Sequence, residues 1–457
     1  MEHGRLDQET LTTMIGTGDI DTVLVAFPDL QGRLLGKRVT GHFFLDHVLA
    51  EGVDACTYLL AVDIDMDPLP GYRFANWETG YGDFVLRPDL ATLRPVPWLE
   101  KTALVLCDLA DPETAEPVEV SPRRILRRQI ERAAAAGLAV KCGSELEFYL
   151  FKDSYDDAGA RGYSRLTPHS AVIEDYHILQ TTKDEYLIRQ IRNAMDGAAI
   201  PVEFSKGEAG RGQHEINLRY ADALEMADRH TIYKNGAKEI AALSDRAITF
   251  MAKYTMDECG NSCHLHSSLW SAEGDKPLDW DDDAPTHMSG TFRYYLGGLL
   301  AASRELSYLF APYVNSYKRY QPGSWAPTAI VWGRDNRTCG LRLVGRGSGF
   351  RVESRIPGGD CNPYLAYAAT IAAGLHGIEH RLDPGPEFRG NAYEAEGVPR
   401  VPSTLVEAIA ELEGSELAAK AFGEDVHFHL VNTARQEWAA SNRVVTDWEL
   451  RRSFELA

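Results

Sequence analysis

The sequence predicts an α+β protein in which a small β-rich domain precedes a larger mixed domain. Residues 1–110 hold short apolar strands, such as residues 22–27, between turn-rich stretches such as residues 68–71. Residues 108–120 are rich in Pro, Asp and Glu and have the composition of a linker. Over residues 111–457 helical patterns alternate with short strands, so two domains are expected.

The larger half contains helices with recognisable ends. One begins with Ser121 as N-cap and Pro122 at the first helical position, and it stops before Gly137. Its arginines lie largely outside the apolar stripe, so we expect a solvated face. A capping box at residues 446–449 begins the last stretch. The predicted helices span residues 122–136, 222–247, 288–309, 363–379 and 403–441.

Composition and charge exclude several classes of protein. With 44% hydrophobic and 25% charged residues, the chain is of globular type. The 67 acidic against 47 basic residues give a net charge of −20, which disfavours nucleic acid and anionic membranes as partners. No apolar run approaches the roughly 18–20 residues of a membrane span. Residues 1–7 lack a signal-peptide layout and the seven cysteines are scattered, so we expect a cytoplasmic protein.

Three segments place polar side chains on one face of a strand, because residues two apart point the same way. Residues 143–151, 262–270 and 349–357 each combine this polar face with an apolar face that demands burial. Charges on such strands are costly unless they are paired or bound to metal. The groups that share a face are Glu145 with Glu147, His264 with His266 and Ser268, and Arg351 with Glu353 and Arg355.

A fourth segment, residues 206–218, adds Glu208 and Glu215, and three glycines between them supply a turn. Five glutamates and one or two imidazoles favour Mg²⁺ or Mn²⁺ over zinc or copper. Converging carboxylates can hold two metals that bridge phosphate oxygens, as phosphoryl transfer requires. The alternative for each segment alone is an ordinary exposed strand face.

Arginines supply the second half of the pattern. Arg319, Arg337 and Arg342 join the arginines of residues 349–357, and guanidinium groups suit carboxylate and phosphoryl oxygens. Arg337 and Arg342 differ in strand parity, so one of them should lie on a bend. No Walker-type loop is present, so phosphates would be held by metals and arginines.

Two other patterns predict no site. Cys259 and Cys263 precede His264 and His266, but no second cysteine pair follows at finger spacing, so structural zinc is not expected. The pair at residues 427–429 lies in a helical pattern without acidic neighbours at useful spacing, so its histidines are expected to be structural.

Taken in order, these segments resemble the glutamine synthetase family. The resemblance extends from about residue 20 to the end and rests on residues 143–148, 212–216, 260–269, 315–319, 336–337, 351–355 and 362–366. It implies a β-grasp domain over residues 1–110 and a catalytic domain of antiparallel strands with helices over residues 111–457. It also implies a homo-oligomer, usually a dodecamer of two hexameric rings, with active sites between subunits.

The resemblance assigns roles to the residues. One metal would bind Glu147, Glu208 and Glu215, and the other Glu145, His264 and Glu353. Glutamate would be held by Gly260, Arg319 and Arg355. ATP would be contacted by Glu203, Tyr220, His266, Ser268, Arg342 and Arg351. Arg337 would stabilise the transferring phosphoryl group beside Glu353. The implied reaction is ATP- and Mg²⁺-dependent phosphorylation of the glutamate γ-carboxylate, followed by attack of an amine.

One departure from the family bears on the amine. Ammonia-using members carry a glutamate six residues after the arginine that matches Arg319, and this chain has Trp325 there. A carboxylate favours ammonium and helps to deprotonate it, whereas an indole offers an apolar wall and a cation–π face of roughly 0.5–2 kcal/mol. A larger organic amine therefore fits better. Ser262 and Cys263 also alter the loop of residues 260–263, which the resemblance assigns to glutamate binding and which we name the glutamate loop. Asp54 is the candidate for the family's ammonium-site acid.

The sequence thus predicts a ligase that resembles the γ-glutamylpolyamine and γ-glutamylethanolamine synthetases. Polyamines are favoured because the chain is acidic, and ethanolamine comes next. A true glutamine synthetase using ammonia is the alternative within the class. A non-catalytic scaffold or sensor is the alternative outside it, but all six inferred metal ligands and the arginines are present.

Overall fold

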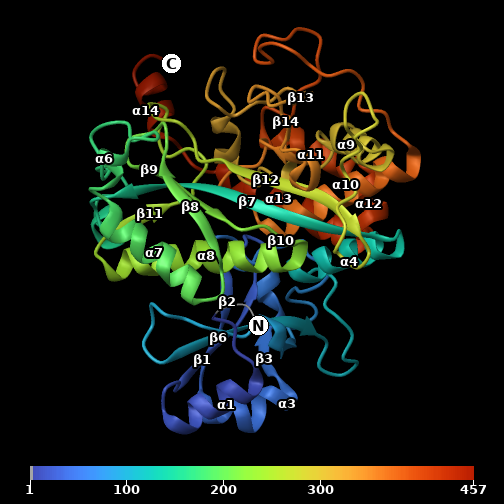
Figure 1. Ribbon diagram of the computed structural model, residues 1–457. Coiled ribbons are helices and arrows are strands. Elements are labelled where there is room, and N and C mark those ends of the chain that lie inside the picture. Colours follow the sequence, from blue (N-terminus) through green and yellow to red (C-terminus); the bar gives the residue numbers. More distant parts are fainter. Residues whose placement is uncertain (1–3) are drawn as a thin grey trace.

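The computed structural model describes residues 4–457 and contains two sheets, one below the other in Figure 1. The smaller sheet has the strand order β2-β1-β6-β4-β3, and β5 pairs with β6. Its strands are β1 (Thr22–Pro28), β2 (Leu34–Thr40), β3 (Val53–Cys56), β4 (Asp83–Pro88), β5 (Arg94–Pro95) and β6 (Thr102–Ala110). Helices α1 (Gln8–Thr17), α2 (Gly41–Phe43) and α3 (Leu49–Glu51) lie at its outer end.

The larger sheet has nine strands, in the order β13-β14-β15-β12-β7-β9-β8, with β10 and β11 also paired to β7. Its long central strand, β7, therefore has neighbours on both sides. The strands are β7 (Leu138–Phe151), β8 (Val202–Gly207), β9 (Gln213–Leu218), β10 (Ala221–Asp222), β11 (Ala247–Thr249), β12 (Cys263–Ser271), β13 (Trp332–Arg334), β14 (Leu341–Val344) and β15 (Arg351–Ser354).

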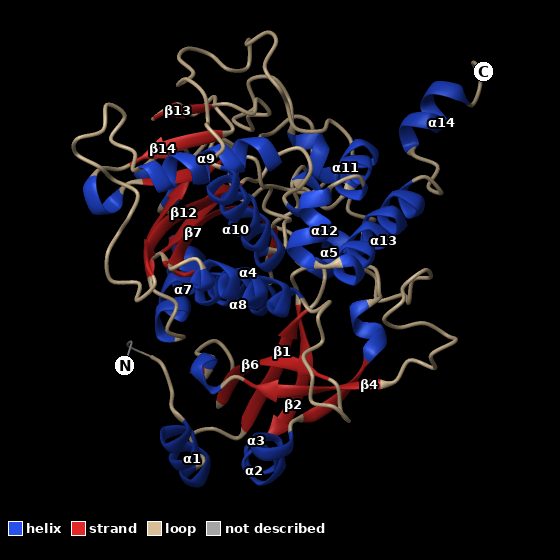
Figure 2. Cartoon of the chain, turned by 90° about the vertical axis from the view of Figure 1, so that its right-hand side faces the viewer, coloured by secondary structure: helices blue, strands red, loops and turns tan. Residues whose placement is uncertain are grey.

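Helices cover one face of the larger sheet (Figure 2). The central one, α10, is buried along most of its length, as its nearly all-apolar sequence requires, and it packs against α4, α8 and α9. The helices of this half are α4 (Pro122–Ala135), α5 (Tyr155–Ala160), α6 (Ile178–Thr181), α7 (Glu185–Gly197), α8 (Ala223–Leu243), α9 (Gly290–Ala302), α10 (Pro363–His380), α11 (Leu405–Glu413), α12 (Glu416–Phe422), α13 (Glu424–Ser441) and α14 (Asp447–Ser453). None of the helices in residues 4–457 is long and apolar enough to cross a bilayer.

Three expectations from the sequence need correction. The segment expected as a linker begins later, because Asp108 still belongs to β6. The helix expected over residues 288–309 ends at Ala302. The helix expected over residues 403–441 is three helices. Ser415 caps the second of them, and Gly423, whose φ is 90°, ends it before the third begins. The capping box on Thr446 is confirmed.

The arginine face of α4 is also different from the prediction. Arg123 is buried, with 1% of its surface exposed, and its guanidinium lies 3.0 Å from Asp228, 2.7 Å from Asp89 and 2.6 Å from Asp108. A guanidinium in this position must be paired, because an isolated buried charge is costly. The ion pairs join α4 to α8, to Asp108 on β6 and to Asp89 just past β4, and so connect helices of the larger half to the smaller sheet.

Candidate active site

Strand register brings the polar faces of the larger sheet together. Glu147 on β7 lies directly opposite Glu215 on β9, and Glu145 on β7 lies opposite His264 on β12. On the next strand, Glu353 of β15 lies opposite His266 of β12. Directly opposite side chains share a face and lie within contact of each other. The polar side chains that alternate along the sequence therefore form one polar surface across four neighbouring strands, β15, β12, β7 and β9.

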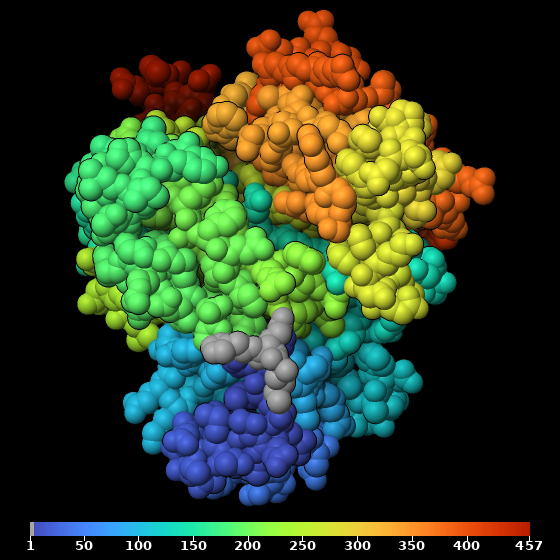
Figure 3. Space-filling view, in the orientation of Figure 1, coloured from blue at the N-terminus to red at the C-terminus, as the bar shows by residue number. Residues whose placement is uncertain are grey.

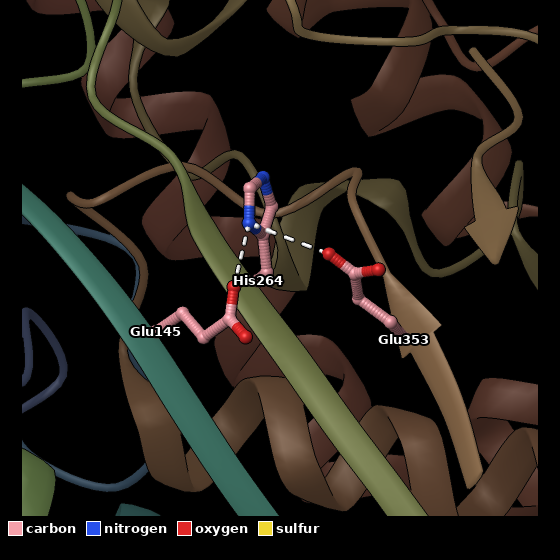
Figure 4. Close-up of side chains that lie close together, drawn as sticks. All are labelled: Glu145, His264 and Glu353. Carbon is pink, nitrogen blue, oxygen red and sulfur yellow. Dashed lines mark hydrogen bonds and ion pairs between the residues drawn. The ribbon is translucent and has the colours of Figure 1, made fainter. Parts of the chain in front are cut away.

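The first cluster is formed by Glu145, His264 and Glu353, which point toward one another in Figure 4. His264 Nδ1 lies 3.2 Å from Glu145 Oε2 and 3.5 Å from Glu353 Oε1. His264 Nε2 is buried and has no hydrogen-bond partner. Burial lowers the pKa of His264, so the neutral imidazole that binds metals is favoured. One imidazole and two carboxylates fit a divalent cation here.

The second cluster contains Glu147, Glu215 and His264, whose donor atoms lie within 4.8 Å of one another. Burial, and after it the charge of Glu208, raise the pKa of Glu147 to about 8 and that of Glu215 to about 10. Glu208 lies just past β8, lines the same space and contacts Lys206. Crowded, buried carboxylates of this kind are the donor set expected for Mg²⁺ or Mn²⁺.

Arginines neutralise the far side of the first cluster. Arg342 Nη1 lies 2.9 Å from Glu353 Oε2, and Arg355 Nη1 lies 2.5 Å from Glu353 Oε1. Burial alone would raise the pKa of Glu353, but the charges of Arg355 and His264 bring it down to about 2. Arg342 is on β14 whereas Arg337 is in the preceding turn, so the bend expected from their parity is confirmed.

Two adjoining cavities contain most of the predicted site. The larger, which we name the catalytic cavity, has a volume of about 700 Å³. Figure 3 shows a hollow in this region, between the green segment near residues 170–220 and the orange segment near residues 315–350. Of the predicted residues it is lined by Glu145, Glu147, Glu208, Glu215, Gly260, His264, Trp325, Arg337, Arg342 and Arg355.

The smaller cavity, named the side cavity, has a volume of about 390 Å³. It shares Glu145, Phe204 and Asn217 with the catalytic cavity, so the two spaces adjoin at these side chains. Tyr220 and Trp270 stack at a centroid distance of 6.4 Å on its wall. Five of the six residues predicted to contact ATP line this cavity: Glu203, Tyr220, His266, Ser268 and Arg351.

Three predicted residues line neither cavity: Glu353, which belongs to the first cluster, and two residues that lie elsewhere. Arg319 is buried behind the glutamate loop, where it donates a hydrogen bond to Ser262 Oγ and packs so closely on Gly260 that an added Cβ would lie 2.4 Å from its Cγ. Arg319 lines neither cavity. Asp54 is exposed on β3 of the smaller sheet and is not brought to the catalytic cavity of its own chain.

Sequence reasoning missed two polar residues of the site. Gln213 Nε2 donates to Glu147 Oε2 at 3.2 Å and to the Gly260 carbonyl at 3.1 Å, so it ties a carboxylate to the glutamate loop. Lys206 lines the catalytic cavity, contacts Glu208 and lies over the ring of Tyr176, 4.4 Å from its centroid. Lys206 lies near the end of β8, two residues before Glu208, and this spacing could have indicated that the two side chains share a site.

Comparison with known proteins agrees with this geometry. Residues 119–453 match the family model of the glutamine synthetase catalytic domain, and the chain belongs to that family. It is an ATP-dependent carbon–nitrogen ligase with the glutamine synthetase fold.

Individual relatives narrow the comparison. The chain is 53% identical to γ-glutamylethanolamide synthetase GlnA4 of Streptomyces coelicolor, over 98% of this chain and 96% of that protein. It is 37% identical to a glutamate–isopropylamine ligase of a Pseudomonas species, over 96% of each chain. Its fold matches the solved structure of ligand-free GmaS with a TM-score of 0.85 and 30% identity, over 98% of this chain and 99% of that one. A GmaS complex with ADP matches equally well, with a TM-score of 0.85.

Proposed function

We propose that the protein joins the γ-carboxylate of glutamate to a small primary monoamine of the ethanolamine type, using ATP and Mg²⁺ or Mn²⁺. The observation that carries the proposal is Trp325, which lines the catalytic cavity at the position where the resemblance places a glutamate in ammonia-using enzymes. Trp325 is 55% exposed in the single chain, so its indole is available to an incoming substrate. An indole favours an amine with an organic substituent over ammonium.

The two cavities give the reactants separate places. The nucleotide fits the side cavity, where Arg351 and the aromatic wall of Tyr220 lie. Its terminal phosphate would reach the catalytic cavity at Glu145, which lines both spaces. The amine would then bind in the part of the catalytic cavity that the nucleotide leaves free, whose lining includes Tyr176, Lys206 and Trp325.

The residues of the chain define the chemistry. The metal clusters fit two divalent cations, which would supply positive charge to the phosphoryl oxygens when bound. Arg337, Arg342 and Arg355 line the cavity and add guanidinium charge where negative charge develops in phosphoryl transfer. Formation of a γ-glutamyl phosphate turns the carboxylate into an acyl group that an amine can attack.

Local charge favours a monoamine over the polyamine suggested by the acidity of the whole chain. The Lys206 ammonium lies in the catalytic cavity, held by Glu208 and 3.7 Å from Asp175 Oδ1. A second ammonium on a diamine would have to compete with Lys206 for these carboxylates, whereas ethanolamine presents a neutral hydroxyl there. The names of the two relatives, an ethanolamide synthetase and an isopropylamine ligase, also point to monoamines.

The test is phosphate release from ATP with glutamate and Mg²⁺, measured across ammonium, ethanolamine, isopropylamine, putrescine and spermidine. Turnover mainly with ethanolamine or isopropylamine supports the proposal. Turnover mainly with ammonium makes the protein a glutamine synthetase, and turnover mainly with polyamines overturns the role given to Lys206. ATP binding without turnover on any amine favours the alternative of a non-catalytic scaffold or sensor.

A further inference from the structure

A second group of possible metal ligands lies behind the catalytic cavity, outside the site described above. Glu174, Asp184 and His214 place three donor atoms within 4.8 Å of one another. His214 Nε2 lies 2.9 Å from Asp184 Oδ2 and 3.3 Å from Glu174 Oε2. The residues are almost completely enclosed, with 0%, 0% and 1% of their surfaces exposed. We name this group the buried triad.

The two carboxylates of the triad have few partners. Neither carboxylate oxygen of Glu174 accepts a hydrogen bond, although both oxygens are buried. Asp184 contacts His169 Nδ1 through its other oxygen. Within the described part of the chain, neither carboxylate forms an ion pair with a lysine or arginine, and the ion-pair partners they have are imidazoles. Two carboxylates in such a site are costly without a cation.

We propose that Glu174, Asp184 and His214 bind one divalent first-row metal ion, Zn²⁺ or Mn²⁺, separate from the metals of the catalytic cavity. A mixed set of one imidazole and two carboxylates suits these ions. Ligand atoms at 2.0–2.2 Å from a tetrahedral ion lie about 3.4 Å apart, close to the separations in the triad. His169 holds Asp184 from behind, as an outer partner orients a metal ligand.

A metal in this place would fix one wall of the catalytic cavity. The segment from His169 to Asp184 has only the short helix α6 as regular structure, yet Asp175, Tyr176 and Ile178 from it line the cavity. It already packs tightly on β8, because a Cβ on Gly207 would lie 2.6 Å from the Glu174 carbonyl oxygen. The metal would tie this segment to β9 beside Glu215.

The experiment uses the full chain, stripped with a chelator and then titrated with Co²⁺ in the presence of saturating Mg²⁺. We expect wild-type protein to bind one equivalent of Co²⁺ that Mg²⁺ does not displace, with a visible absorption band of a four-coordinate site. Asp184→Asn and Glu174→Gln should each weaken this binding at least tenfold. Glu185→Gln, which removes the neighbouring carboxylate outside the triad, and Glu208→Gln, in the catalytic cavity, should retain it.

The result that overturns the proposal is a wild-type protein without this equivalent, or one whose equivalent disappears with Glu208→Gln and survives Asp184→Asn. The triad would then be a hydrogen-bonded network only. Should the triad variants fail to fold, a crystal of wild-type protein soaked in Co²⁺ decides the question. An anomalous difference peak between Glu174, Asp184 and His214 supports the site, and a map without that peak rejects it.

Discussion

Glu353 on β15 and Arg355, just past the end of that strand, contact each other: Arg355 Nη1 lies 2.5 Å from Glu353 Oε1, and Arg342 contacts the other carboxylate oxygen. A cation bound by Glu145, His264 and Glu353 must compete with these guanidinium groups. Metal binding should therefore release Arg355 toward the cavity, where it can bind the substrate carboxylate. We expect Mg²⁺ to raise glutamate affinity about tenfold, within the usual range of coupling between sites.

Isothermal titration of glutamate with and without Mg²⁺ checks this coupling. Arg355→Lys is the matched control, since it keeps the charge but loses the fork-shaped group, and it should reduce the effect of Mg²⁺. Equal glutamate affinities with and without Mg²⁺ in the wild type would contradict the coupling.

Trp325 should decide the preference for ethanolamine over ammonium. Trp325→Glu should lower kcat/KM for ethanolamine about tenfold, because the aromatic face is lost, and it should raise turnover with ammonium. Trp325→Phe keeps an aromatic ring and should fall only a few-fold. The ratio of ethanolamine to ammonium turnover is the quantity to measure, and an unchanged ratio in Trp325→Glu would remove Trp325 from the specificity argument.

Lys206 should exclude a second positive charge from the amine end of the cavity. In Lys206→Met we expect turnover with putrescine, relative to ethanolamine, to rise about tenfold, the change that removal of roughly 1.4 kcal/mol of repulsion produces. Lys206→Arg retains the charge and should keep the wild-type ratio. A rise in Lys206→Arg equal to that in Lys206→Met would show that side-chain shape, not charge, sets the ratio.

Arg123 should matter to stability far more than its neighbour on α4. Arg123→Leu leaves Asp228 buried without its guanidinium partner, so we expect the free energy of unfolding to fall by about 3–5 kcal/mol. Arg124→Leu, which breaks more exposed pairs with Glu119 and Glu131, should cost about 1 kcal/mol or less. Urea denaturation of both variants makes the comparison, and equal losses would contradict it.

His429 gives the fold a defined dependence on pH. Burial lowers the pKa of His429 to about 4, although Nε2 contacts the Leu60 carbonyl. Below pH 6.5 the unfolded chain takes up a proton that the folded site takes up only near pH 4. Stability should therefore fall as pH drops through this window, by about 3 kcal/mol in all. His429→Gln should show a flatter profile in denaturation between pH 7 and 4, and an identical slope would exclude His429 as its source.

The sequence predicted which side chains of the candidate site share a strand face wherever periodicity decides the structure. Glu145 with Glu147, and His264 with His266, could be placed on common strand faces because their strands alternate with apolar residues that demand burial. Which strands would be neighbours was not visible, so the direct pairing of Glu147 with Glu215 required the structure. Periodicity alone does not say which segments meet in one site, and the resemblance to a family supplied that information.

Predictions failed where partners lie far apart in the chain. Arg123 was expected in solvent because the arginines of its helix lie largely outside the apolar stripe, and its buried partner Asp228 is 105 residues away. The long C-terminal helix was expected because apolar periodicity continues across Gly423, although the backbone turns there. The division into domains at residue 110, the dodecamer of two rings and the cytoplasmic location stay predictions.

The wall shared by the two cavities has a consequence for the order of events in catalysis. Glu145, Phe204 and Asn217 line both spaces, while Tyr220 lies only on the side cavity and Trp325 only on the catalytic cavity. With the nucleotide and the amine bound as proposed, the two would occupy different cavities, so we expect neither to exclude the other. We therefore expect any compulsory order in the steady-state kinetics to come from rearrangement of charged groups such as Arg355, and not from one substrate blocking the path of another.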